Sequence, residues 1–186
     1  HLTNNEADLH YLQLLSQSFP TIAEASTEII NLEAIMALPK GTEHFLADIH
    51  GESDAFRHIL KNASGNIKRK VNELFGNDIR ESEKKELCTL IYYPEEKLEL
   101  IKAQEKDIED WYRITIHQLV KVCRDVSSKY TRSKVRKSLP PDFSYIIEEL
   151  LHESLSDNDK AAYVSVIVNT IISTGRADDF ICAICN

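Results

Sequence analysis

The sequence predicts a mainly α-helical protein with one short strand, and three observations lead to this fold class. Apolar residues recur every three or four positions along most of the 186 residues, as on one face of an amphipathic helix. The five glycines fall between these periodic stretches, where helix-ending residues belong. One short apolar run lacks the helical period and lies between Gly41 and Gly51, which favours a β-strand. We expect many helices and one or a few strands of an incomplete α/β core.

The first two helices are expected over residues 5–18 and 22–36. Pro20 ends the first helix, and Thr21 is placed to cap the second. The second helix carries an apolar stripe at helical spacing and stops before Pro39.

Residues 43–49 are the strand candidate, since they are short, apolar and bounded by glycine. After Gly51 the helical period returns and continues to Gly76, with a break expected at Gly65. A lone strand needs partners for its backbone hydrogen bonds, and this chain supplies none convincingly. That shortage predicts that further sequence completes the core.

Beyond Gly76 the whole chain is expected to be helical. Pro94 separates a helix over residues 82–92 from one long helix or two helices over 95–130. Further helices are expected after residues 140–142, up to Gly175, and from Arg176 onward. The apolar pattern is still unfinished at residues 182–186, so we expect the chain to be truncated after residue 186.

Composition excludes several classes of function. The hydrophobic content is 42% and the charged content 28%, and no apolar run approaches the eighteen or so residues of a membrane span. The net charge of −8 argues against a nucleic-acid partner. The polar start does not resemble a signal peptide, and the four scattered cysteines do not form a disulfide framework. We therefore expect a cytoplasmic protein with no membrane partner.

The stretch that indicates chemistry is Asp48-Ile49-His50-Gly51. On a strand, Asp48 and His50 would point to the same face at its carboxyl end, where open α/β sheets place their sites. Gly51 would let the backbone turn closely, and the following helix would bring its positive end near. A carboxylate and an imidazole suit divalent metals such as Mn, Fe or Zn. The alternative is that Asp48 merely caps the following helix.

The motif and its surroundings resemble a known family. Asp-Ile-His-Gly after an apolar strand resembles the first motif of the calcineurin-like metallophosphoesterases, whose core is α/β. The flanking sequence resembles the class III fructose-1,6-bisphosphatases of many bacteria at residues 18–23, 28–35, 38–45, 60–65 and 87–94, and the resemblance covers the whole chain. The resemblance implies hydrolysis of the 1-phosphate of fructose 1,6-bisphosphate in gluconeogenesis. It also implies a binuclear Mn²⁺ centre, with Asp48 and His50 among the metal ligands.

The chain departs from that family where the remaining metal ligands should be. The later motifs Gly-Asp-x-x-Asp-Arg-Gly and Gly-Asn-His-Asp are absent. Two ligands are present of the roughly six that a two-metal centre needs. We therefore expect residues 1–76 to hold N-terminal helices plus the first strand and helix of the phosphoesterase core, and 77–186 to be a helical insertion. The isolated chain should be inactive, its partners being the sugar phosphate and the remainder of its own polypeptide, and no catalytic residue is assigned.

Two alternatives stay open at this stage. The chain could be a non-catalytic helical module for oligomerisation or regulation, and a homo-oligomer is compatible with either interpretation. A nucleotide or protein phosphoesterase would share the short motif but not the flanking text. The basic run at residues 129–137 is either a solvated helix end or a site for an anionic effector or an acidic partner.

Overall fold

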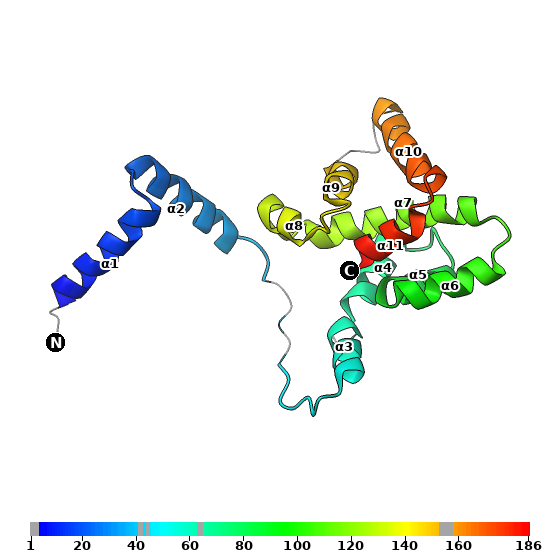
Figure 1. The fold of residues 1–186 in the computed structure, drawn as a ribbon, viewed down its shortest axis with the longest axis horizontal. Helices are drawn as coiled ribbons and strands as arrows, with labels where there is room; N and C mark the ends of the chain where they lie inside the picture. The colour runs from blue at the N-terminus through cyan, green and yellow to red at the C-terminus, as the bar shows by residue number, and fades with distance from the viewer. Residues whose placement is uncertain (1–3, 41–42, 44, 63–64, 153–157) are drawn as a thin grey trace. The chain divides into compact units, whose positions relative to one another are not determined.

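The computed structural model describes residues 4–40, 43, 45–62, 65–152 and 158–186. Within these ranges it contains eleven helices and no strand, so the expectation of a mainly helical chain is confirmed. The chain forms two compact units, residues 1–40 and 41–186 (Figure 1). In the described ranges no helix is both long and apolar enough to cross a membrane.

The first unit consists of α1 (Asn4–Ser18) and α2 (Ile22–Met36), close to the predicted ranges. Thr21 caps α2, because its hydroxyl accepts from the Glu24 amide at 3.2 Å and the Glu24 carboxylate accepts from the Thr21 amide at 3.1 Å. No side chain of α2 is buried. Large apolar side chains are instead exposed on both helices: Leu9, Tyr11, Leu12, Leu14, Leu15, Ile22, Ile29, Ile30, Leu32, Ile35 and Met36.

The predicted strand was wrong. Its residues 43 and 45–49 form no regular secondary structure, and His44 lies outside the described residues. Phe45 is 91% exposed, and Leu46 and Ile49 are exposed as well. A strand is stable only when a neighbouring strand takes up its backbone hydrogen bonds, and the described part of the chain offers no such neighbour.

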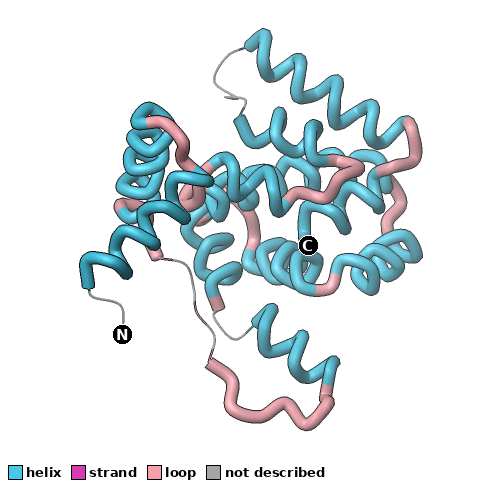
Figure 2. The backbone as a smooth tube through the Cα atoms, turned by 60° about the vertical axis from the view of Figure 1, so that its left-hand side comes forward, coloured by secondary structure: helices cyan, strands magenta, loops and turns pink. Residues whose placement is uncertain are grey.

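The second unit contains the other nine of the described helices, drawn as a tube in Figure 2. The predicted break at Gly65 is present, and residues 95–130 form two helices. The bounds are α3 (Ser53–Asn62), α4 (Asn66–Phe75), α5 (Glu81–Tyr92), α6 (Pro94–Gln104), α7 (Ile108–Ser127), α8 (Arg132–Ser138), α9 (Ser144–His152), α10 (Asn158–Ser173) and α11 (Ala177–Cys185).

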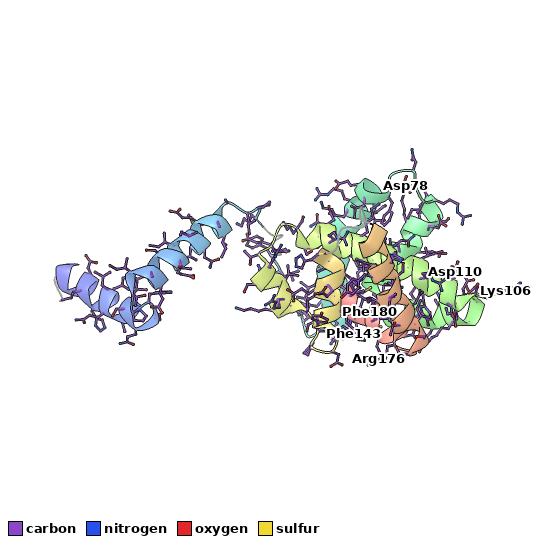
Figure 3. The ribbon with its side chains drawn as sticks, turned by 90° about the horizontal axis from the view of Figure 1, so that it is seen from above. Asp78, Lys106, Asp110, Phe143, Arg176 and Phe180 are labelled. Atoms are coloured by element: carbon purple, nitrogen blue, oxygen red, sulfur yellow. The ribbon has the colours of Figure 1, made fainter. Side chains whose placement is uncertain are left out.

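The core of this unit lies around α7 and α11. Helices α4, α9, α10 and α11 all pack on α7, and α11 also contacts α5, α6 and α10. Phe180 and Ile181 of α11 are fully buried. Phe180 meets Phe143 edge to face with ring centroids 5.4 Å apart (Figure 3), an arrangement that aromatic rings prefer.

The second unit begins well before the division predicted from the sequence. Val71 and Phe75 of α4 belong to its core, although both precede residue 76. The predicted division into 1–76 and 77–186 concerns the layout of a longer protein and stays a prediction. The compact units of this chain divide after Lys40.

Candidate metal centre

A tight turn positions the two predicted metal ligands. The Glu52 amide donates to the Ile49 carbonyl at 3.0 Å, and the Ser53 amide donates to the Gly51 carbonyl at 3.0 Å. His50 has a φ of +50°, which non-glycine residues rarely adopt, and Gly51 has a φ of +74°. The turn therefore ends the irregular segment and leads directly into α3.

The turn brings the Asp48 and His50 side chains together. Nε2 of His50 lies 2.9 Å from Oδ2 of Asp48, with 80% of the histidine side chain and 65% of the aspartate side chain exposed. Oδ1 of Asp48 accepts from the His50 amide at 3.4 Å. Asp48 thus makes its hydrogen bonds within the turn, and it does not cap α3 as the alternative interpretation required. The expected neighbourhood of the two side chains is present, although a turn produces it and not a strand.

The pair fits part of a metal coordination shell. Two adjacent ligands of an octahedral ion, each about 2.1 Å from the metal, lie about 3.0 Å apart. The 2.9 Å between Nε2 and Oδ2 matches this spacing, and a carboxylate with an imidazole is a suitable donor set. Among the described residues, no group of three or more His, Cys, Asp or Glu side chains is placed to hold an ion. Any further ligands must come from outside the described residues.

Helix α3 ties this turn to the rest of the second unit. Lys61 donates to the Tyr92 carbonyl at 2.9 Å, and the Asn62 amide group donates to the Tyr93 hydroxyl at 3.1 Å. The His58 ring stacks on Tyr93, and its Nδ1 also contacts the Tyr93 hydroxyl. Sequence reasoning missed this cluster, because its partners are more than thirty positions apart and no local pattern links them.

The four cysteines are free thiols. Burial raises the pKa of Cys123 to about 11, and burial together with the neighbouring thiols of Cys182 and Cys123 raises the pKa of Cys185 to about 12. Both side chains therefore stay protonated near neutral pH and are poor nucleophiles and metal ligands.

Comparisons with known proteins show which family the chain resembles. Residues 10–186 match the family described as Firmicute fructose-1,6-bisphosphatase. The chain is 75% identical over 179 residues to a protein named fructose-1,6-bisphosphatase class 3 from Bacteroides thetaiotaomicron, which covers 96% of this chain. It is 77% identical over 180 residues to the protein of that name from Bacteroides fragilis, which covers 97% of this chain. The chain spans only 27% of the length of each relative. No solved structure matches it.

Proposed function

The chain belongs to the Firmicute fructose-1,6-bisphosphatase family, and from this we propose that the full-length protein hydrolyses the 1-phosphate of fructose 1,6-bisphosphate. The observation that carries the proposal is the family match over residues 10–186, supported by relatives of that name at 75–77% identity. We place the reaction in gluconeogenesis and the protein in the cytoplasm, as the resemblance implies.

Asp48 and His50 are proposed as two ligands of a binuclear Mn²⁺ centre. A bound metal pair supplies an activated water and neutralises charge on the phosphoryl oxygens. The 2.9 Å separation of the two side chains keeps them at one exposed corner of the turn. Helix α3 begins at Ser53, so the positive end of its dipole lies near this turn and favours the binding of an anionic group there.

The isolated chain is proposed to be inactive. It supplies two ligands where two metal ions need roughly six, and it spans about a quarter of the length of its relatives.

The test uses the full-length protein with Asp48→Asn and His50→Ala. Each variant should lower kcat/KM about a hundredfold or more, since even residues that only support metal ligands cost ten- to a hundredfold. Bound manganese, measured by elemental analysis, should fall from two ions to one or fewer per chain. Asp78→Asn and His10→Ala are matched controls on exposed residues and should change neither value. Unchanged metal content and activity in both site variants would reject the assignment.

The exposed apolar side chains of α1 and α2 favour a second candidate, a non-catalytic association module. In that case the Asp48 and His50 variants would keep full activity, while charged substitutions on α2 would change the oligomeric state. A phosphoesterase for nucleotides or proteins would instead be recognised by substrate profiling, because it would prefer those substrates over fructose 1,6-bisphosphate.

A further inference from the structure

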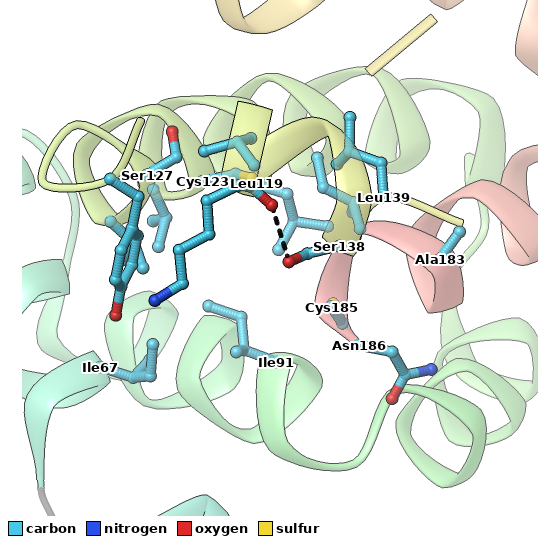
Figure 4. A pocket seen from close by; sticks show the side chains of 16 residues that line it. Ile67, Ile91, Leu119, Cys123, Ser127, Ser138, Leu139, Ala183, Cys185 and Asn186 are labelled. Carbon is cyan, nitrogen blue, oxygen red and sulfur yellow. Dashed lines mark hydrogen bonds between the residues drawn. The ribbon is translucent and has the colours of Figure 1, made fainter. Parts of the chain in front are cut away.

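A cavity of about 420 Å³ opens in the second unit between α4, α5, α7, α8 and α11 (Figure 4). Its volume lies in the range of about 300–1,000 Å³ that is typical of small-molecule sites. Most of its wall is apolar, and the main contributors are Ile67, Ile91, Leu119, Val126, Leu139 and Ile184. Such a wall suits the hydrocarbon or aromatic part of a small-molecule ligand.

Few of the side chains that line the cavity are polar, and only one of these side chains is charged. Lys134 is this charged residue, and no aspartate or glutamate lines the cavity. The Lys134 ammonium lies 4.8 Å from the centre of the Tyr130 ring, and among the described residues it has no carboxylate within ion-pair distance. The Ser138 hydroxyl donates to the Lys134 carbonyl at 3.0 Å and so steadies the helical turn that carries the lysine (Figure 4).

The surroundings add to the positive charge at this end of the cavity. Lys129 also lies over the Tyr130 ring, at 5.3 Å, whereas Arg136 is neutralised by Glu148 at 2.6 Å. Although the whole chain has a net charge of −8, Lys129 and Lys134 make the electrostatic potential at this end of the cavity positive. A ligand that matches the site has an apolar body and a single anionic head.

We propose that this cavity binds an amphipathic monoanion, such as a medium-chain or aromatic carboxylate. The body lies against the apolar wall, and the carboxylate pairs with the Lys134 ammonium, with the Tyr130 hydroxyl available as a second donor. A single lysine suits one carboxylate better than a polyanion. The inference depends on the cavity alone and holds whether or not Asp48 and His50 bind metal.

The apolar wall of the cavity supplies the reporters. Ile67, Ile91 and Ile184 line it, whereas Ile22 and Ile114 do not. A bound ligand should therefore shift the methyl signals of the first three isoleucines. Decanoate is the probe, used below its micelle threshold on the chain of residues 1–186 and on the full-length protein. Methyl NMR during a decanoate titration should show concentration-dependent shifts of the Ile67, Ile91 and Ile184 signals, with those of Ile22 and Ile114 unchanged.

Variants separate the anionic head from the apolar body. Lys134→Gln should weaken decanoate binding about tenfold, the effect of one charge-assisted contact of about 1.4 kcal/mol. Lys137→Gln removes the same charge from the same helix but lies outside the cavity, and it should change affinity less than twofold. Circular dichroism checks that both variants remain folded.

Three results would overturn the proposal. Equal affinities for decanol and decanoate would show that the anionic head contributes nothing to binding. Unchanged methyl signals of Ile67, Ile91 and Ile184 in the presence of decanoate would mean that the cavity does not bind the probe. Shifts in residues 1–186 but none in the full-length protein would mean that other parts of the polypeptide cover the cavity.

Discussion

At the scale of single residues, the Asp178 carboxylate joins three helices. It accepts from the Tyr112 hydroxyl of α7 at 2.6 Å and from the Lys102 ammonium of α6 at 2.8 Å, while Asp178 itself lies in the first turn of α11. Burial alone would raise the pKa of Asp178, but the hydrogen bonds from Lys102 and Tyr112 outweigh it and hold the pKa below its ordinary value of 3.8. The ionised carboxylate is therefore the form that stabilises this junction.

Asp178→Asn should lower the free energy of unfolding by about 1 kcal/mol at pH 7, since Asn keeps an acceptor but loses the charge. A carboxylate whose pKa is depressed on folding stabilises above its ordinary pKa and loses this effect as the pH falls through the lower folded value. The difference between variant and parent should therefore shrink progressively as the pH falls below about 4. Urea unfolding at several pH values measures it.

The neighbouring Asp179 offers the control for this experiment. Among the described residues it pairs only with Arg176 of its own helix end, and its side chain is 65% exposed. Asp179→Asn should change stability little at any pH, because exposed pairs contribute little. If Asp178→Asn lowers the free energy of unfolding equally at every pH, the substitution disturbs packing and not charge.

At the scale of elements, α3 is held mainly by polar contacts. None of its side chains is buried, and its hydrogen bonds to the α5–α6 corner run from His58, Lys61 and Asn62 to Tyr92 and Tyr93. A helix attached in this way should open more easily than the core helices. The stability of the turn that carries Asp48 and His50 depends on the same attachment.

Tyr93→Phe removes the hydroxyl that contacts His58 and Asn62 and keeps the ring. The loss of about 1 kcal/mol should speed amide hydrogen exchange in α3 about fivefold and leave α7 unchanged. Tyr145→Phe, on a side chain that is 68% exposed, should change neither helix. Unchanged exchange in α3 would show that the hydroxyl contacts do not hold the helix.

The elements also show what the sequence could predict. Helices satisfy their backbone hydrogen bonds internally. The periodic spacing of apolar residues, the Thr21 cap and the glycine breaks were therefore enough to predict most of the helices. The strand at residues 43–49 was predicted wrongly, because a strand depends on a partner that a local pattern cannot supply. The closeness of Asp48 and His50 was predicted correctly, since it needs only two positions of separation. The Tyr93 cluster and the cavity arise from packing between distant segments, which spacing along the chain does not reveal.

At the scale of the whole molecule, the two units differ in how they are stabilised. All the buried apolar residues of the described core lie between Val71 and Ile181, and α2 contributes none. The second unit thus holds a continuous hydrophobic core of its own.

Removing the first unit should therefore change the free energy of unfolding of the second by less than about 1 kcal/mol. Such a change shifts the thermal midpoint by only a few degrees in domains of this size, so residues 41–186 alone should unfold within about 2 °C of residues 1–186. Circular dichroism at 222 nm measures both. The shorter chain should also be more soluble, because it lacks the exposed apolar side chains of α1 and α2. A midpoint lower by 10 °C would show that the first unit stabilises the second.

The central position of α11 has a consequence for biosynthesis. The helix that fills the middle of the core with Phe180 and Ile181 is also made last among the helices of this unit. At about 5–20 residues per second, a ribosome needs roughly 7–30 s to synthesise the 41–186 stretch. During that time α5, α6, α7 and α10 have no α11 to cover their inner faces. The nascent chain therefore passes through a period in which the apolar surface of this unit is open to chaperones, and it can complete this core only after α11 has left the ribosome.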